Sequence, residues 1–577
     1  MIRTLTILSL LTVGLSACKP TVRTSYKKTP AAPETPVAVE APVAPEAPVA
    51  PEAPVAVETP VAVETPVAPE APVAVEAPVA PETPVAVEAP VAVEAPPAVQ
   101  SPAEQPAAPE PQPAVVQQEP AHSLLVVNAT LQKYNSLRPW EKETPRHASA
   151  LGVYMGEGRV LTVGRVVENA TYVELLLPDK SRTVPARVLR YDEDMNLALL
   201  TVANEDDGSL FDARTPLPLG EAMSRGDAAT YAGLINGVEP VHVELQAENA
   251  GGDKVPLMVM RAARPLPDGL TTGSPVVRDG KLSGLGVSYR KQEHLLQVVN
   301  AEVIQRFLTQ AQAGVPVLGM VYTPLDDPQF RKYLKLDAAA NGLYISKVLP
   351  GSAAEAAGLK VGDVVTAVEN MPLDNQGRCN HSRYGLHSAN VLLCGMKDMG
   401  QELALTVSRA GETLQLQVRL NRDAVDNALF RPQKPGVQPR YIMWGGMLFQ
   451  PLTSTLMTEI GNSRNGVLPL EFQMLEQGQD ALREAGCTEP VALTSVLSTV
   501  ATQGYDELTL SRLIAVNGKP VREFADLPAL LDEPTENGLI KLEFNKAPYA
   551  VYVERAAVDA VNEQLRQSAI PRLRVVE

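Results

Sequence analysis

Hydrophobic and polar positions alternate over short stretches between residues 123 and 305, and turn residues separate those stretches. The segment SALGVYMGEGRVLTV holds two apolar runs joined around Gly156-Glu157-Gly158, which is the pattern of a hairpin. Further alternation follows on both sides of a turn predicted at Pro178-Asp179. A helical pattern, NAEVIQRFLTQAQ, occupies Asn300 to Gln312. Many short strands without long helices predict a β-barrel or sandwich that this helix closes.

A second unit begins at GVPVLGMVYTP and mixes strands with short helices. In its segment GLYISKVLPGSAAEAAGLKVGDVVTAVENMPL we expect a strand, then a turn at Pro350-Gly351. A short helix should begin near Ser352 and end at Gly358. A tight turn at Gly362-Asp363 should then lead into the next strand.

A third unit begins at Tyr441 with YIMWGGMLFQPLT and contains RLIAVNGKPVREFADLPALL. Its stretch IAVNGKPV mirrors TAVENMPL of the second unit, so the two units share a turn and a strand. A helical stretch from Ala556 to Ser568 follows near the end of the sequence.

The N-terminal segment MIRTLTILSLLTVGLSAC has the features of a processing signal. Its apolar run is too short to span a bilayer of about 30 Å as a permanent helix. LSAC resembles the lipobox of bacterial lipoproteins, which implies cleavage after residue 17 and lipidation of Cys18. An ordinary signal peptide with a chance cysteine is the alternative. With Lys19 next in sequence, the resemblance implies a lipid anchor in the outer membrane, facing the periplasm or the cell surface.

Residues 29–120 are a low-complexity segment of Pro, Ala, Val and Glu. Glutamates recur every six residues from Glu34 to Glu94, and prolines keep the same period from Pro36 to Pro96. Because a polyproline II helix has three residues per turn, this repeat separates prolines and glutamates onto different edges. About ninety residues at ~3.1 Å each could extend for roughly 280 Å. We expect a disordered or polyproline II tether; a Pro-rich ligand for a partner domain is the alternative.

Charge and cysteine content exclude several function classes. The tether holds fourteen glutamates and no Lys, Arg or Asp, so it supplies most of the net charge of −17. The rest of the chain is close to neutral, which argues against a nucleic-acid partner. Cys379 and Cys394 could form a disulfide in an oxidising compartment. The four cysteines show no CxxC spacing and the six histidines are scattered, so no metal site or cofactor is predicted.

The order of these units, with the segment Gly342–Leu373, resembles the HtrA/Deg family. That resemblance implies a mainly β chain with α+β modules, in which a chymotrypsin-like double β-barrel precedes a PDZ domain and a second, degenerate PDZ-like domain. MWGGMLFQPLT and GYDELTLSRLIAVNGKPV are most similar to the Deg branch also found in plants. The predicted domains are a signal peptide (1–17), a linker (18–120), a trypsin-like domain (121–312), a PDZ domain (315–421) and a degenerate PDZ-like domain with a C-terminal helix (438–577).

The resemblance also locates the positions of a catalytic triad, and all three depart from the family pattern. LTVGRVV places Arg165 where the family has its histidine base, and NLALL places Asn196 where it has aspartate. LTTGSP places Thr272 at the nucleophile and Leu270 at an oxyanion-loop glycine. Arginine stays protonated and cannot accept a proton from a hydroxyl. Asn196 carries no charge to stabilise an imidazolium. We therefore expect a protease fold with no intact catalytic residues.

Displaced catalytic groups are the alternative to complete loss of activity. Ser274 is a candidate nucleophile, Asp194 and His242 are candidate partners, and Lys281 is a candidate base for a Ser–Lys dyad. For any of these residues to act in catalysis, the strand register would have to differ from the one that the HtrA/Deg motif match implies.

The second unit keeps the sequence that PDZ domains use to bind a peptide C-terminus. In the family, backbone N–H groups of a short loop hold the carboxylate while the peptide adds as an extra strand. PVLGMVY matches that loop, which implies Leu318, Gly319 and Met320 as peptide-binding residues. An ordinary core strand with a closed groove is the alternative. The third unit has WGGMLF at the equivalent place, and its irregular groove favours packing or assembly.

Relatives in this family are commonly trimers built through the start of the protease domain. KYNSLRPW offers Tyr134 and Trp140 for such contacts, although a core role for both is equally open.

Three functions follow from these features. The leading hypothesis is a lipid-anchored pseudoprotease that binds peptide C-termini or unfolded segments in the cell envelope as a scaffold, sensor or chaperone-like protein. The second is an active HtrA-type serine endopeptidase of envelope quality control. The third is a structural spacer lipoprotein. Hydrolysis of an unfolded protein separates the second from the others, and peptide binding by residues 315–421 separates the first from the third.

Overall fold

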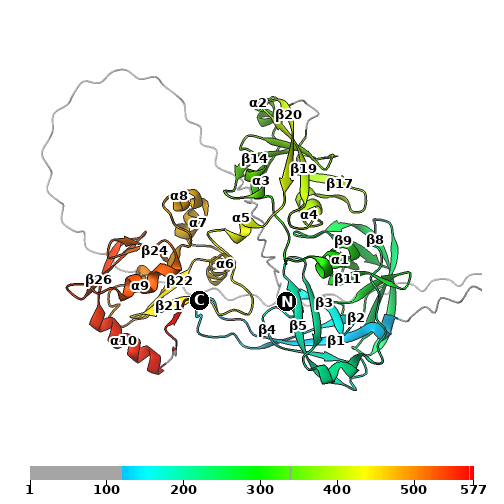
Figure 1. Cartoon of the computed structure of the whole chain (residues 1–577), viewed down its shortest axis with the longest axis horizontal. Helices are drawn as coiled ribbons and strands as arrows, with labels where there is room; N and C mark the ends of the chain where they lie inside the picture. Colours follow the sequence, from blue (N-terminus) through cyan, green and yellow to red (C-terminus); the bar gives the residue numbers. More distant parts are fainter. Residues whose placement is uncertain (1–119, 337–340, 569, 571) are drawn as a thin grey trace, which may run out of the picture. The chain divides into compact units, whose positions relative to one another are not determined.

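The computed structural model describes residues 120–336, 341–568, 570 and 572–577 (Figure 1). The predicted signal peptide, Cys18 and the Pro/Glu tether up to residue 119 lie outside these residues. In the described part, no helix is long and apolar enough to span a membrane.

Two closed six-stranded barrels form the first domain, as the alternating pattern predicts. The first barrel has the order β1-β2-β3-β6-β5-β4. Its elements are η1 (Pro120–Ser123), β1 (Leu124–Leu131), β2 (Arg146–Gly156), β3 (Arg159–Val163), η2 (Gly164–Val166), β4 (Ala170–Leu176), β5 (Thr183–Asp192), β6 (Leu197–Val202) and η3 (Glu205–Phe211).

The second barrel has the order β10-β11-β12-β9-β8-β7. Its elements are β7 (Ala228–Ile235), β8 (Glu239–Gly251), β9 (Leu257–Ala262), β10 (Pro275–Arg278), β11 (Lys281–Arg290), β12 (Leu295–Asn300) and the closing helix α1 (Ala301–Thr309).

Local sequence explains the turns and the cap of this domain. Glu157 and Gly158 both have positive φ and join β2 to β3, which confirms the predicted hairpin. The Asn300 side chain accepts a hydrogen bond from the Ala301 N–H, and asparagine is a preferred residue at the start of a helix. Its amide also donates to the Met223 carbonyl at 2.8 Å, so one residue both caps α1 and holds the neighbouring loop.

A five-stranded path with order β13-β14-β15-β19-β20 forms the sheet of the second domain, and β13 lies at its edge. The predicted helix begins after Ser352, whose hydroxyl accepts from the Glu355 N–H. Its elements are β13 (Met320–Pro324), α2 (Pro328–Tyr333), β14 (Leu343–Val348), α3 (Ala353–Ala356), β15 (Val364–Val368), β16 (Met371–Pro372), the hairpin β17 (Arg378–His381) and β18 (Gly385–Ser388), α4 (Ala389–Cys394), β19 (Glu402–Arg409), β20 (Glu412–Arg419) and α5 (Asp423–Asp426).

The third domain has a longer sheet, with order β27-β26-β24-β23-β22-β21-β28 and β25 paired to β24. Its strands are β21 (Tyr441–Trp444), β22 (Met447–Pro451), β23 (Val491–Val496), β24 (Ser511–Val516), β25 (Lys519–Pro520), β26 (Leu539–Phe544), β27 (Ala550–Glu554) and β28 (Arg574–Val575). Its helices are α6 (Ser454–Ser463), α7 (Leu470–Gln477), α8 (Gln479–Glu484), η4 (Asp506–Leu508), η5 (Phe524–Asp526), α9 (Leu527–Asp532) and α10 (Arg555–Ser568). The last is the predicted C-terminal helix.

Candidate functional site

Two of the three positions that the sequence resemblance assigns to a catalytic triad lie side by side in the first barrel. The short helix η2 follows β3 and exposes the Arg165 side chain. The Arg165 N–H donates to the Asn196 side-chain oxygen at 2.9 Å, and the Gly164 N–H donates to the Asn196 carbonyl at 2.8 Å. Asn196 itself has a φ of 53°, a conformation that asparagine tolerates. Asn196 therefore positions the loop that carries Arg165, but it brings no negative charge.

Arg165 also affects a neighbouring carboxyl group. Burial raises the pKa of Glu168, the charge of Glu193 raises it further, and Arg165 opposes this rise. Arg165 thus acts as a fixed positive charge beside Glu168. A guanidinium is a donor only, so it cannot serve as a general base at this position.

The loop with Thr272 is held against the first barrel by its backbone. The Leu151 N–H of β2 donates to the Thr272 carbonyl at 2.9 Å, and the Gly273 N–H donates to the Gly286 carbonyl at 2.7 Å. Gly273 has a φ of 80°, and a Cβ at this position would collide with the Leu151 carbonyl. The Thr272 hydroxyl has no hydrogen-bond partner among the described residues, so no group stands ready to take its proton.

The alternative nucleophile, Ser274, has a structural role. Its side chain is fully buried, and its hydroxyl donates to the Thr271 carbonyl at 2.8 Å and lies 3.3 Å from the Tyr231 hydroxyl. These contacts satisfy the group and leave it away from solvent.

The alternative catalytic partners are placed elsewhere. The Asp194 carboxylate accepts from Lys254 Nζ at 2.5 Å, from the Val315 N–H at 3.0 Å and from Arg422. Burial alone would raise the pKa of Asp194, but Lys254 and Arg422 outweigh it and hold that pKa below its ordinary value. His242 lies exposed on β8 and Lys281 begins β11. None of these three groups has a hydrogen bond to Thr272 or Ser274 in the described part of the chain.

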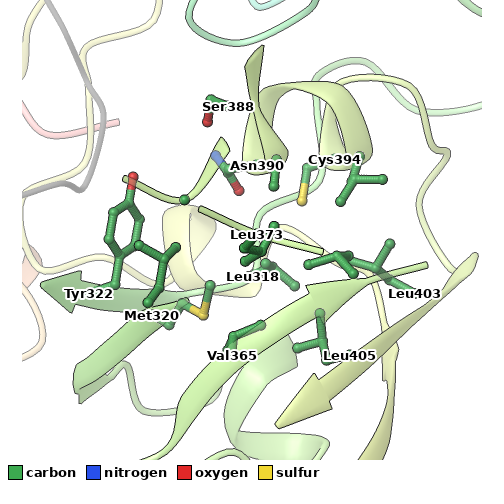
Figure 2. A pocket seen from close by; sticks show the side chains of 15 residues that line it. Leu318, Met320, Tyr322, Val365, Leu373, Ser388, Asn390, Cys394, Leu403 and Leu405 are labelled. Carbon is green, nitrogen blue, oxygen red and sulfur yellow. The ribbon is translucent and has the colours of Figure 1, made fainter. Parts of the chain in front are cut away.

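Two of the three predicted peptide-binding residues, Leu318 and Met320, line a groove of the second domain, whereas Gly319 lies between them in the chain and is not part of the lining. Leu318 and Met320 lie on one side of the groove, where β13 is the edge strand among the described residues, and Asn390, Leu393 and Cys394 of α4 lie on the other. Figure 2 shows the labelled side chains of both elements converging on the same space. β15 and β19 contribute Val365, Val368, Leu403 and Leu405 to the lining. The groove is therefore apolar inside and polar at the rim of α4.

The backbone of the loop before β13 leaves donors available. Gly319 has a φ of 75°, and its carbonyl accepts from the Leu349 N–H at 2.9 Å, while the Leu318 carbonyl accepts from the Ala354 N–H at 2.9 Å. Among the described residues, the N–H groups of Leu318 and Gly319 have no acceptor. Unpaired N–H groups at the end of a groove are the feature that a carboxylate requires.

The groove is narrow. The cavity between β13 and α4 measures about 20 Å³, which is room for about one water molecule. The enclosed part of the groove therefore favours a small terminal side chain.

The α4 wall and the β19 floor were not predicted as site residues. ANVLLC carries a helical apolar pattern that could have indicated α4, but no spacing in the sequence shows that it faces β13.

The cysteines differ from the sequence prediction. Cys379, Cys394 and Cys487 are buried free thiols, so the predicted bond between Cys379 and Cys394 is not formed in this structure. Cys379 lies on β17, whereas Cys394 ends α4 and lines the groove. Burial raises the pKa of the Cys394 thiol to about 12, so it stays protonated at neutral pH. The described residues contain no cluster of His, Cys, Asp or Glu that could hold a metal ion.

The aromatic residues expected at a trimer contact make contacts within the chain. The ring centroids of Trp140 and Tyr441 lie 5.8 Å apart, and Lys142 Nζ lies 5.0 Å from the centre of the Tyr134 ring. The Gln438 side chain donates to the Pro139 carbonyl at 3.1 Å. The trimer remains a prediction of the resemblance.

Comparisons with known proteins show which proteins this chain is similar to. PDZ domain models match residues 323–379 and residues 431–575. Protease Do-like 2, chloroplastic, of Arabidopsis thaliana is 26% identical over 451 residues, which cover 75% of this chain and 71% of the relative. Periplasmic serine endoprotease DegP of Escherichia coli is 24% identical over 289 residues, which cover 46% of this chain and 55% of DegP. The chain is an HtrA/Deg-like protein.

Solved structures of HtrA-type proteases are also similar to this HtrA/Deg-like chain. The structure described as HtrA-type protease AlgW with decapeptide covers 53% of this chain and 96% of its own, with 18% identity and a TM-score of 0.38. The third domain, which the sequence resemblance describes as degenerate, is matched by a PDZ model over nearly its full length.

Proposed function

We propose that this HtrA/Deg-like protein binds peptide C-termini or unfolded protein segments through its first PDZ domain and does not cleave them. The observation that carries the proposal is an exposed guanidinium at the general-base position, in a chain whose apolar groove still has a free strand edge. The groove keeps the features that peptide binding needs, whereas the triad positions lack the groups that hydrolysis needs.

Loss of hydrolysis is supported by the chemistry of three positions. Serine and threonine hydroxyls need a neighbouring base near neutral pH. Arg165 donates only, Asn196 is neutral and serves as a loop cap, and Thr272 has no hydrogen-bonded partner in the described part of the chain. Buried Ser274 donates to a backbone carbonyl and does not replace Thr272.

Peptide binding is supported by the geometry of the groove. An incoming extended peptide can pair with β13, the edge strand, while its terminal carboxylate accepts from the free N–H groups of Leu318 and Gly319. Its last side chain would then point between Met320 and Cys394. All the residues that this binding mode uses belong to the second domain.

The same proposal includes the cell-envelope location. Lipidation at Cys18 and a tether of about ninety residues would hold the globular domains at a distance from the outer membrane. Exposed C-termini of envelope proteins would then be the accessible ligands, in a scaffold, sensor or chaperone-like role.

An active endopeptidase is the second candidate, because the relatives Protease Do-like 2 and DegP carry protease names. It would require a proton acceptor for Thr272 that lies outside the triad positions.

The peptide-binding half is tested with octapeptides that carry an N-terminal fluorophore and end in Ala, Val, Leu or Phe. Asn390 is an exposed residue on α4 at the rim of the groove, so Asn390→Phe should block the groove without disturbing the core. Gln417→Phe is the matched control, because Gln417 is exposed on β20, the opposite edge of the same sheet. We expect at least one peptide to bind the natural chain and the Gln417→Phe chain, and to bind the Asn390→Phe chain at least tenfold more weakly. Equal binding to all three chains would contradict the proposed site.

A further inference from the structure

The third domain repeats the strand arrangement of the first PDZ domain. β16 pairs β15 in the first PDZ domain, and β25 pairs β24 in the third domain. Starting from that match, β13-β14-β15-β19-β20 corresponds strand for strand to β22-β23-β24-β26-β27. The strand equivalent to the peptide-accepting β13 is therefore β22.

The edge of β22 is already occupied, unlike the edge of β13. β21 pairs antiparallel with β22, with Ile442 opposite Phe449 and Trp444 opposite Met447. Antiparallel addition along an edge strand is the way in which a peptide joins such a sheet. β21 thus lies where a bound peptide would lie.

The side chains of β21 also enter the equivalent groove. Ile442 and Trp444 are two residues apart, so they point to the same face of the strand. Both are buried in one cluster with Phe449 of β22 and with Leu527 and Leu531 of α9, the helix that follows β25. The intervening Met443 packs on the opposite face with Leu448 and Leu573. Alternate side chains thus fill the groove as those of a ligand would.

The chain reaches the two grooves differently. In the first PDZ domain, the Val317 N–H donates to the Asn421 carbonyl at 2.8 Å, so the chain before β13 is drawn away from the edge of that strand. In the third domain, Gly445 and Gly446 both have positive φ and turn the chain straight back along β22. The Asn562 side chain of α10 accepts from the Gly445 N–H at 2.9 Å and fixes this turn.

We propose that residues Tyr441–Trp444 are a built-in ligand that fills the peptide groove of the third domain, with Trp444 in place of the ligand's last side chain. The third domain accordingly accepts no external peptide at this groove, and recruitment of peptides is left to the first PDZ domain.

Trp444 provides the test, because the chain has two tryptophans and Trp140→Phe leaves Trp444 as the single reporter. In the full chain carrying Trp140→Phe and Asn390→Phe, the labelled octapeptides should not bind, and the blue-shifted emission of buried Trp444 should not change. Saturable binding accompanied by a red shift of Trp444 emission would overturn the inference. The Trp140→Phe chain with natural Asn390 reports separately on the first groove, so failure of the proposed function is distinguished from failure of this inference.

A cavity variant gives an independent readout. Trp444→Ala should lower the Tm, and added indole should recover part of the loss by filling the vacated groove. Met443→Ala, on the opposite face of the same strand, should show no indole response. If Trp444→Ala does not fold, Trp444→Leu is measured instead. Absence of any indole response in the folded Trp444 variant, or an equal response in Met443→Ala, would overturn the assignment of Trp444 to the groove.

Discussion

The residues at the three positions that the resemblance assigns to a catalytic triad still hold or belong to ordered loops of the two barrels. Asn196 still organises the Arg165 loop through its side-chain oxygen, a task that an aspartate could perform equally well. Gly273 still allows the Thr272 loop to touch β2. Under the proposed function, the groups that differ from the family pattern are those that would carry a proton or a charge, so the fold would keep its architecture without the chemistry.

Glu168, which lies beside Arg165, links a single titrating group to the stability of the fold. Because the pKa of Glu168 is raised in the folded chain, its charged form lowers the free energy of unfolding at neutral pH. This destabilisation shrinks as the pH falls through the folded pKa, because the carboxyl group becomes neutral. We predict that Glu168→Gln increases stability at pH 7 by less than about 1 kcal/mol. The gain should shrink as the pH approaches 4, measured by thermal unfolding across that range. A gain that grows on acidification would contradict the argument.

Gly273 gives a second prediction at this scale. Alanine at a positive φ costs about 1–3 kcal/mol from the backbone alone, and its Cβ would also collide with the Leu151 carbonyl. We therefore expect Gly273→Ala to lower the Tm markedly. Gly280→Ala is the control, because Gly280 has a similar φ of 70° but open space around its Cβ position. An equal fall in Tm in both variants would show that the close contact between Gly273 and β2 does not contribute to the effect.

At the scale of elements, the width of the groove between β13 and α4 determines which peptide fits. The cavity is about 20 Å³, and Cys394 lies on its α4 side. We predict that Cys394→Ala improves binding of peptides with Leu or Phe at the C-terminus relative to Ala. Cys394→Leu should weaken all of them by at least about tenfold, or ~1.4 kcal/mol. Fluorescence anisotropy with the four octapeptides measures both effects, and an unchanged ranking in Cys394→Ala would contradict a size-limited pocket.

The sequence predicted the elements whose signals are local. The β2–β3 hairpin, helix α1 after Asn300, helix α3 after Ser352 and helix α10 all follow from turn residues, caps or apolar periods. It did not predict which strand occupies which edge. WGGMLF shows an irregular turn, but only the register of β21 on β22 shows that the groove is filled. Pairing between segments is a tertiary property, and a single sequence contains no local signal for it.

At the scale of the whole described chain, Asp194 connects residues distant in sequence. Its carboxylate binds Lys254, the Val315 N–H and Arg422, so it joins the loop before Asn196 to both ends of the second domain. We predict that Asp194→Asn destabilises the chain by about 1–3 kcal/mol at pH 7, because Lys254 and Arg422, both partly exposed, lose a mostly buried partner. Since the folded pKa of Asp194 is lowered, its stabilisation is complete above about pH 4 and is lost on further acidification. The difference between Asp194→Asn and the natural chain should therefore shrink below pH 4, and a constant difference would contradict this role.

The central claim is that the protein binds unfolded segments without cleaving them. It is tested most directly by incubating the purified full chain with a fluorescently labelled unfolded protein and following both anisotropy and fragment size. The account predicts a rise in anisotropy and an intact labelled protein over the full incubation, for the natural chain and for Thr272→Ala alike. A parallel variant with Arg165→His, Asn196→Asp and Thr272→Ser shows whether the fold can support cleavage. Fragments produced by the natural chain and absent with Thr272→Ala or Ser274→Ala would contradict the account.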